Sequence, residues 1–166
     1  MMGESRMKIE KITTVEQDCD FCGLTLLSKE EYVKRKDRIK PIESWWWLSS
    51  PGYGSSRASS VADDGSLDYF NRVDMGHGYV RPALIILNPK SQNLKIGDKF
   101  KFYEHNWTMI SERYALCDEE FCRMAFREYW AAKNANIYEA SDIKRYLDDE
   151  WDKMKGGEQD GIDLQK

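Results

Sequence analysis

Hydrophobic and polar positions divide the first half of the chain into short strands and one helix. The segment 24–27 is typical of a strand, and Ser28 followed by Glu31 has the spacing of a helix capping box. This pattern predicts a helix over 29–38, with the Lys and Arg side chains of 34–38 in solvent. Its inward face is expected to hold Tyr32, Val33 and Ile39.

Pro41 ends this helix, and the aromatic run 45–48 (WWWL) predicts a short strand. Further along, Asp64-Gly65 is a strong hairpin signal between strands over 60–62 and 66–70. The stretch 79–87 is expected to form one buried strand that closes a first structural unit, because its proline stands near the beginning, where a missing N–H is tolerated.

The second half predicts a hairpin, a third strand and a helix. Residues 96–102 alternate into 106–110 as a hairpin, 114–117 adds a strand, and 141–154 has helical spacing. The face of that helix is formed by Ile143, Tyr146, Leu147 and Trp151. The expected class is α+β. The expected parts are an N-terminal lead-in (1–20), a first half (21–88), a companion hairpin and helix subdomain (94–155) and a disordered tail (156–166).

Composition and net charge limit the kinds of partner that we expect. With 166 residues, of which 41% are hydrophobic, the chain is long enough for a packed core. A formal net charge of -4 provides no general attraction for nucleic acid or an anionic membrane. No apolar run approaches the roughly 20 residues of a membrane helix, and the N-terminus has no secretory signal, so we expect a cytoplasmic protein with no membrane partner.

The four cysteines form two close pairs, Cys19/Cys22 and Cys117/Cys122. Reduced, buried thiols are one interpretation. The other is a four-thiolate zinc site, since zinc binds close pairs brought together from distant segments. No other cofactor is expected, because Asp63, Asp64, Asp68 and Asp74 lack a calcium-loop signature.

Catalytic groups are sparse. His77 and His105 are the only side chains with an ordinary pKa near neutrality, and neither lies in a recognisable motif with a nucleophile. The glycine segments 52–54 and 76–78 lack the preceding strand and following helix of a phosphate-binding loop. We therefore expect a protein that is not an enzyme.

Three segments carry a family resemblance: 26–32 (LLSKEEY), 45–52 (WWWLSSPG) and 80–87 (VRPALIIL). They resemble a family of gut Firmicutes and their phages with W-W-L-R-S-P-G and V-R-P-A-L motifs. That resemblance implies a C-type-lectin-like half, the fold also used by formylglycine-generating enzymes and by variable proteins of diversity-generating retroelements. Ser49 replaces the usual arginine, and the absence of cysteine from 79–87 means that oxidase chemistry is not carried over.

The resemblance also implies that the polar stretch between the two motifs lies on an exposed face, where binding would occur. Its amphipathic rings and adaptable polar groups are typical of recognition loops. Adjacent tryptophans of a strand point to opposite faces, which favours a core role for 45–47 over a sugar-stacking platform. The predicted ligand-binding residues are Tyr53, Ser55, Ser56, Arg57, Ser59, Asp68, Tyr69, Asn71 and Arg72.

Three functions follow from these observations. The first is a non-enzymatic protein-binding module of phage or prophage origin, in its sharper version diversified by a retroelement and assembled into a virion. The second is a small intracellular phage inhibitor, an anti-defence protein with an acidic surface. The third is a zinc-binding protein using the four cysteines. The acidic surface would consist of Asp142, Asp148, Asp149, Glu150 and Asp152.

Overall fold

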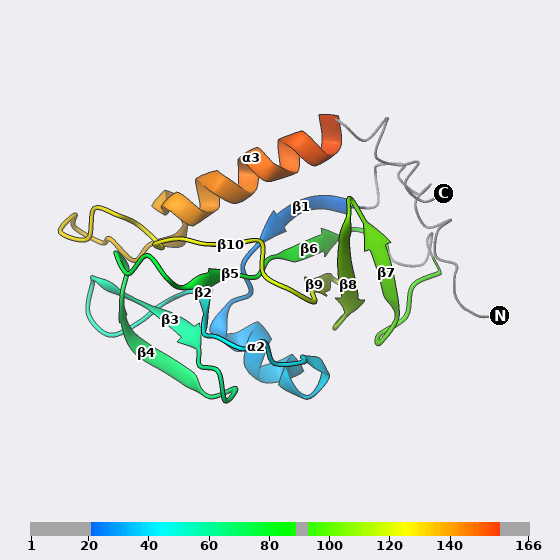
Figure 1. Ribbon diagram of the computed structural model, residues 1–166, viewed down its shortest axis with the longest axis horizontal. Helices are drawn as coiled ribbons and strands as arrows, with labels where there is room; N and C mark the ends of the chain where they lie inside the picture. The colour runs from blue at the N-terminus through cyan, green and yellow to red at the C-terminus, as the bar shows by residue number, and fades with distance from the viewer. Residues whose placement is uncertain (1–20, 89–92, 157–166) are drawn as a thin grey trace. The chain divides into compact units, whose positions relative to one another are not determined.

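The computed structural model describes residues 21–88 and 93–156, and two five-stranded sheets organise these residues. Contacts within the chain define two units, each containing one of the sheets. The described part of the first unit comprises residues up to Leu24, Ala83–Glu119 and residues from Asp148 onward; the second comprises Thr25–Pro82 and Glu120–Leu147. The α+β class is as predicted (Figure 1).

The sheet of the first unit has the strand order β1-β6-β9-β8-β7. Its strands are β1 (Phe21–Thr25), β6 (Ala83–Ile86), β7 (Lys99–Phe102), β8 (His105–Met109) and β9 (Tyr114–Cys117). The predicted hairpin is confirmed as β7 and β8, and the predicted third strand as β9. In the hairpin turn, Tyr103 and Glu104 have φ angles of 49° and 67°. Two-residue hairpin turns whose twist matches that of the strands require this left-handed conformation. Phe21 stacks on Phe100 at 6.0 Å between ring centroids, on the apolar face of the sheet.

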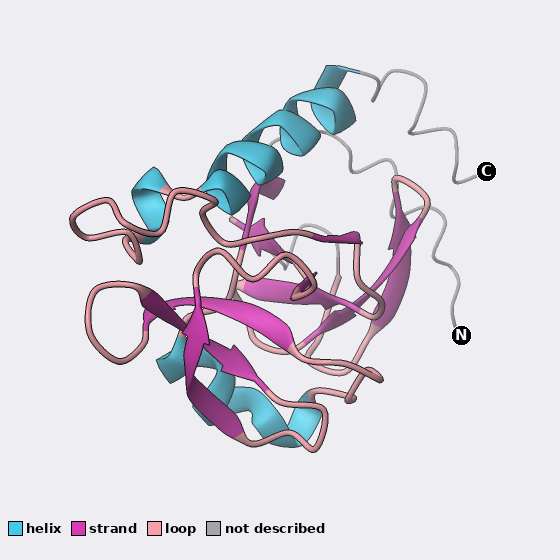
Figure 2. Ribbon diagram, turned by 60° about the vertical axis from the view of Figure 1, so that its left-hand side comes forward, coloured by secondary structure: helices cyan, strands magenta, loops and turns pink. Residues whose placement is uncertain are grey.

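The sheet of the second unit has the order β10-β5-β2-β3-β4, and only its β2–β5 pairing is parallel among the pairs described. Its strands are β2 (Trp46–Pro51), β3 (Arg57–Val61), β4 (Leu67–Arg72), β5 (Tyr79–Val80) and β10 (Cys122–Arg123). The unit also contains α2 (Lys29–Arg35) and the short 3₁₀ helices η2 (Lys36–Arg38) and η4 (Tyr138–Ala140). Figure 2 shows α2 against the strands of this unit.

Strand β2 forms the aromatic core of the second unit. Trp46 and Trp47 are both fully buried although their side chains point to opposite faces, because both faces of β2 are covered. Trp46 meets Tyr32 of α2 edge-on at 5.7 Å. On the other face, the Trp47 indole N–H donates to the Met124 carbonyl at 2.9 Å, and its ring contacts Phe126. The core role predicted for 45–47 is confirmed for Trp46 and Trp47, whereas Trp45 is half-buried.

Helix α2 begins where the sequence predicted. The Ser28 hydroxyl accepts a hydrogen bond from the Glu31 backbone N–H at 3.1 Å, which caps the first turn. The predicted inward face was wrong in one residue: Tyr32 is buried, but Val33 is 51% exposed. Consecutive helical side chains differ by about 100° around the axis, so the residue after an inward-facing one turns toward solvent.

The predicted continuous strand over 79–87 was wrong. Tyr79–Val80 form β5 in the sheet of the second unit, whereas Ala83–Ile86 form β6 in the sheet of the first. The interruption falls at Pro82, which lacks a backbone N–H and has a fixed φ, so a sheet ladder is readily broken there. This segment therefore contributes a strand to each unit and does not close one of them.

Residues 120–147 also differ from the predicted contiguous companion range, 94–155. In β10, Cys122 and Arg123 pair with Val80 and Tyr79 of β5. The Asn136 amide then donates to two backbone carbonyls of the 54–57 turn, at 2.9 and 2.8 Å. These long-range hydrogen bonds place the segment in the second unit.

Helix α3 (Asp142–Gly156) confirms the predicted C-terminal helix. The Ser141 hydroxyl accepts from the Lys144 N–H at 2.9 Å, as an N-cap does. Ile143 and Leu147 are fully buried, as the helical spacing indicated. The predicted lead-in (1–20) lies outside the described residues. So does the predicted tail (156–166), apart from Gly156, which is the last residue of α3.

Candidate functional site

The hairpin formed by β3 and β4 places a group of side chains at the edge of the second unit's sheet. Its turn follows the sequence signal: Gly65 has φ +90°, and the Asp64 carboxylate accepts from the Ser66 backbone N–H at 3.0 Å. The Ser66 hydroxyl also donates to this carboxylate, at 2.6 Å, and these two hydrogen bonds, the hydroxyl one first, lower the pKa of Asp64. Because side chains alternate along a strand, Phe70 and Arg72 share one face of β4.

Two aromatic rings stand in solvent beside this hairpin. Phe70 is 62% exposed and Tyr53 is 66% exposed, with ring centroids 5.7 Å apart. Tyr53 is held by its backbone N–H, which donates to the Tyr69 carbonyl at 2.8 Å. The close approach needs a glycine beforehand, since a Cβ on Gly52 would lie 2.5 Å from that same carbonyl oxygen. The exposed ring therefore stands on a closely packed backbone.

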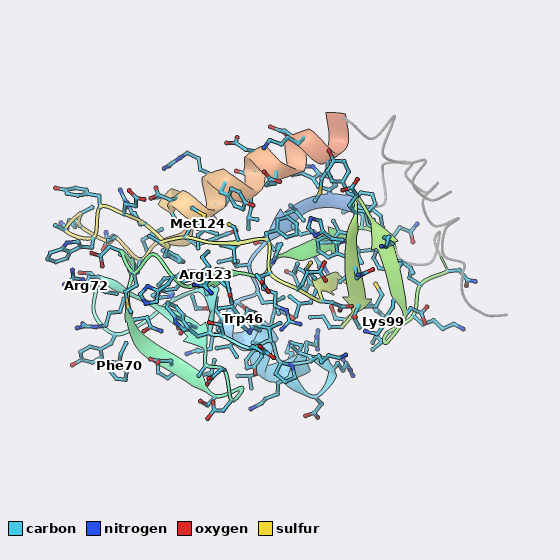
Figure 3. All side chains as sticks on the ribbon, in the orientation of Figure 1. Trp46, Phe70, Arg72, Lys99, Arg123 and Met124 are labelled. Carbon is cyan, nitrogen blue, oxygen red and sulfur yellow. The ribbon has the colours of Figure 1, made fainter. Side chains whose placement is uncertain are left out.

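Arg72 adds a cation to the same face. Its guanidinium lies 4.1 Å from the ring centre of Trp130, which is 42% exposed. It also makes two hydrogen bonds to the Asp74 carboxylate, both at 3.0 Å. These bonds lower the pKa of Asp74 and raise that of Arg72. We call Tyr53, Phe70, Arg72 and Trp130 the aromatic surface; Figure 3 labels its members Phe70 and Arg72 on β4.

Several of the predicted ligand-binding residues support the hairpin. Ser59 is fully buried and donates to the Pro51 carbonyl at 2.8 Å, so its hydroxyl is not available to a partner in this conformation. The Asn71 amide donates to the Ser60 hydroxyl at 2.9 Å. The Asp68 carboxylate accepts from the Phe70 N–H at 2.8 Å. These contacts order the strands themselves.

The remaining predicted residues surround the hairpin. The Arg57 Nε–H donates to the Phe70 carbonyl at 3.1 Å, and Tyr69 lies beneath the Lys29 ammonium at 5.5 Å from its ring centre. Ser56 is half-buried, while Ser55 is exposed. The structure therefore brings Tyr53 and Arg72 of the predicted set onto the aromatic surface and uses most of the others for local order.

Sequence reasoning missed Phe70 and Trp130. Phe70 had a detectable signal, because the alternation of 67–72 places it on the face opposite Tyr69. Trp130 had none, since its loop is distant in sequence and is tied to the hairpin by the Arg127 N–H, which donates to the Val73 carbonyl at 2.9 Å. A long-range backbone hydrogen bond of this kind produces no recognisable pattern in the sequence around either residue.

The structure describes three of the four cysteines, and these three differ in exposure. Cys22 is exposed, Cys117 buried and Cys122 half-buried, and Cys19 lies outside the described residues. The four-cysteine zinc site therefore stays a prediction. Cys117 instead lies close to His105 and Glu119, with one ligand atom of each within 4.8 Å of the others. Within 21–88 and 93–156, this is the one group of three such potential metal ligands.

The acidic residues of α3 are partly neutralised by the same helix. The Asp142 carboxylate pairs with Arg145, and Glu150 pairs with Lys153 at 3.0 Å. The hydrogen bond to Glu150 raises the pKa of Lys153. Both basic partners lie three residues further along, the spacing at which helical side chains meet. The proposed acidic surface stays a prediction, and these pairs weaken the field it would need.

A small cavity of about 190 Å³ lies beside α2. Its lining includes Lys36, Asp64 and the buried Arg81, whose guanidinium lies 5.0 Å from the ring centre of Trp46. The Tyr32 hydroxyl at its wall donates to the Gly65 carbonyl at 2.6 Å, and burial raises the pKa of this phenol. The volume is below the roughly 300 Å³ at which typical ligand pockets begin. This cavity is therefore a weaker candidate than the exposed aromatic surface.

Together these features define an α+β chain that presents aromatic rings and an arginine on and beside an edge hairpin. Residues 13–88, less than half of the chain, match a family described as a domain of unknown function (DUF6273). The match includes the WWWLSSPG and VRPALIIL segments. The comparisons found no matching curated protein and no matching solved structure. None of the described helices has the length and apolar character needed to cross a membrane.

Proposed function

We propose that this chain is a non-enzymatic protein-binding module that contacts its partner through the aromatic surface. The observation that supports this most is the exposure of three large rings, Tyr53, Phe70 and Trp130, beside one arginine. Apolar side chains gathered in solvent mark interaction sites, and tyrosine, tryptophan and arginine dominate the binding energy of many interfaces.

The way β4 is held favours recognition by side chains over addition of a partner strand. At Phe70, in the middle of this edge strand, the backbone N–H donates to Asp68 and the carbonyl accepts from Arg57. A partner strand needs such groups for its own hydrogen bonds. The aromatic rings remain accessible on the face of the sheet, and their ordered backbone limits the entropy lost on binding.

The charges on the surface indicate what a partner would present. Arg72 is already paired with Asp74, so the two side chains together carry little net charge. A strongly acidic partner would gain little from this surface. We therefore expect a partner with an apolar or aromatic centre and a polar rim, which is the usual anatomy of a protein interface.

The finer assignments of fold and origin are part of the same proposal. A C-type-lectin-like half of phage or prophage origin is supported by the resemblance of the WWWLSSPG and VRPALIIL segments, and the packing of α2 on β2 is compatible with it. An experimental structure superposed on C-type-lectin-like domains would test the fold. A neighbouring reverse-transcriptase gene with a template repeat would test the origin, and its absence would remove the retroelement version.

The test of binding uses the full chain as bait in an extract of the cells that carry its gene. Wild type is compared with the triple variant Tyr53→Ala, Phe70→Ala, Trp130→Ala. A protein retained by wild type is then purified, and its affinity for both chains is measured by calorimetry. We expect the triple variant to bind at least about 30-fold more weakly, which corresponds to ~2 kcal/mol, the size of an interface hot spot.

Val33→Ser is the matched control, because Val33 is an exposed apolar residue of the same unit that lies on α2. It should bind like wild type, and all chains should give the same circular dichroism spectrum. Equal affinity of wild type and the folded triple variant would place recognition elsewhere. An α3 variant with Asp148 and Asp149 changed to Asn would then test the acidic-surface alternative.

A further inference from the structure

The register of β8 and β9 brings three potential metal ligands together in the first unit. Trp107 is paired with Cys117 in this antiparallel ladder. His105 lies two residues before Trp107, and Glu119 lies two residues after Cys117. Continuing the antiparallel register therefore places His105 opposite Glu119. Because side chains alternate with a period of two, all four belong to the same face of the sheet. Cys117 and Glu119 are then neighbours along one chain, and His105 lies across from them.

The backbone pairing continues one position beyond the last register pair. The Asp118 backbone N–H donates to the Asn106 carbonyl at 2.8 Å, one position beyond the Trp107–Cys117 pair. The side chain of Asp118 accepts from the Thr108 hydroxyl at 2.6 Å, as expected for the opposite face. Asp118 is thus adjacent in sequence to two of the ligands, but its carboxylate is directed away from them.

The distances suit a single bound ion. One ligand atom each from His105, Cys117 and Glu119 lie within 4.8 Å of one another. His105 Nδ1 and Glu119 Oε2 are 3.5 Å apart. This exceeds the usual N–H···O length of about 2.7–3.2 Å. It is close to the separation of two ligands that bind one tetrahedral ion at about 2.0–2.2 Å each.

The surroundings are closed on one side and open on the other. Cys117 is fully buried, whereas the His105 and Glu119 side chains are 29% and 42% exposed. The His105 ring meets Trp107 edge-on at 6.3 Å, and Phe102 is its partner in the β7–β8 register. Apolar walls of this kind limit the access of water to a metal site.

We propose that His105, Cys117 and Glu119 form a site for a divalent transition metal, zinc by ligand type. Imidazole, thiolate and carboxylate are the three groups that zinc binds in proteins, and three protein ligands leave a fourth, solvent-facing position for water. The thiol of Cys117 binds as thiolate, and its proton goes to solvent. This site does not depend on the proposed protein-binding function, because its ligands belong to a different unit from the aromatic surface.

Cobalt(II) is the probe, because a thiolate bound to cobalt absorbs in the near ultraviolet and tetrahedral cobalt absorbs strongly in the visible. The purified chain, reduced and stripped with a chelator, is titrated with Co²⁺ and then with Zn²⁺. We expect both absorptions at one metal per chain, and their loss when zinc displaces cobalt. Elemental analysis of the untreated protein gives an independent measurement.

Glu119→Gln and His105→Gln are the main variants, since both side chains are partly exposed and their replacement should leave the fold intact. We expect each to weaken metal binding at least about 100-fold, more than the loss of a group that only supports a ligand. Cys117→Ser should abolish the thiolate absorption. Asp118→Asn is the matched control, because it alters a neighbouring carboxylate on the other face, and it should bind cobalt like wild type.

Cys22→Ser and Cys122→Ser separate this site from the four-cysteine zinc site. Both should keep wild-type cobalt spectra. The proposal is overturned if folded wild type shows no cobalt absorption, or if Glu119→Gln and His105→Gln bind as tightly as wild type. It is also overturned if Cys22→Ser removes the metal, which would support a four-thiolate site instead.

Discussion

The β3–β4 hairpin of the second unit and the β8–β9 pair of the first obey the same geometry but distribute their side chains in opposite ways. On β4, the large apolar residue Phe70 points to solvent next to Arg72. In the β8–β9 pair, His105 of β8 and Glu119, two residues beyond the end of β9, lie next to buried Cys117. Each hairpin departs from the usual rule of apolar inside and polar outside.

The comparison directs the search for function to positions whose exposure departs from this rule. An exposed ring gains little for folding, and polar groups beside a buried thiol lose part of their hydration, so both arrangements are candidates for a role other than stability. Sequences that specify a fold agree with it at most positions, and conflicts concentrate at functional sites. The exposed ring on β4 therefore supports the proposed binding surface, and the polar groups beside Cys117 support the proposed metal site.

The largest expected effect separates buried from exposed aromatic residues in the second unit. Trp47→Ala should lower the free energy of unfolding by about 3–5 kcal/mol, because it leaves a cavity beside Phe126 and removes the donor to the Met124 carbonyl. Tyr53→Ala should lower it by less than about 1 kcal/mol, since the Tyr53 ring is mainly in solvent. Urea denaturation followed by circular dichroism measures both. Similar losses would mean that Tyr53 is structural.

The next largest effect tests how tightly the backbone packs against Trp47. A Cβ on Gly78 would lie 2.5 Å from Trp47 Nε1 and 2.7 Å from two ring atoms of Trp45. We expect Gly78→Ala to cost about 1–3 kcal/mol as overpacking. Gly76→Ala is the control, since nothing lies within 4 Å of its Cβ position, and thermal unfolding should show little change. A stable Gly78→Ala variant would contradict the packing described for β2.

A smaller effect is expected on the face of the β8–β9 pair opposite to His105, Cys117 and Glu119. Thr108→Val removes the hydrogen bond to the Asp118 carboxylate, made at 2.6 Å, and should cost about 0.5–1.5 kcal/mol. Cobalt binding by His105, Cys117 and Glu119 should be unchanged, because the valine lies on the opposite face. Urea denaturation and a cobalt titration on the same sample give both values. Loss of cobalt binding in the folded variant would show that the two faces are coupled.

The smallest effect concerns the pH dependence of the Arg72–Asp74 pair. The hydrogen bonds from Arg72 lower the pKa of Asp74 in the folded chain, so their contribution is present above the ordinary Asp pKa of about 3.9 and is lost as pH falls through the lower folded value. Asp74→Asn should cost less than about 1 kcal/mol near pH 7, as for exposed pairs. The difference from wild type should shrink below about pH 3.9 in urea titrations. A difference that grows on acidification would contradict the lowered pKa.

The sequence by itself determined most local elements. The cap at Ser28, the turn at Asp64-Gly65, the β7–β8 hairpin and helix α3 all follow from short-range patterns, because capping, turn conformation and periodicity act within a few residues. The burial of Trp46 and Trp47 was also predictable, since large rings in a run of apolar residues find a core more readily than solvent.

Only the tertiary structure decided which segments meet. Arg81 and Pro82 separate two strands that enter different sheets, and nothing local assigns β5 to one and β6 to the other. Trp130 reaches Arg72, and His105 reaches Cys117 and Glu119, through pairings between residues far apart in the chain or on different strands. Such contacts depend on long-range register and on the packing of whole elements, so a pattern that spans a few residues contains no information about them.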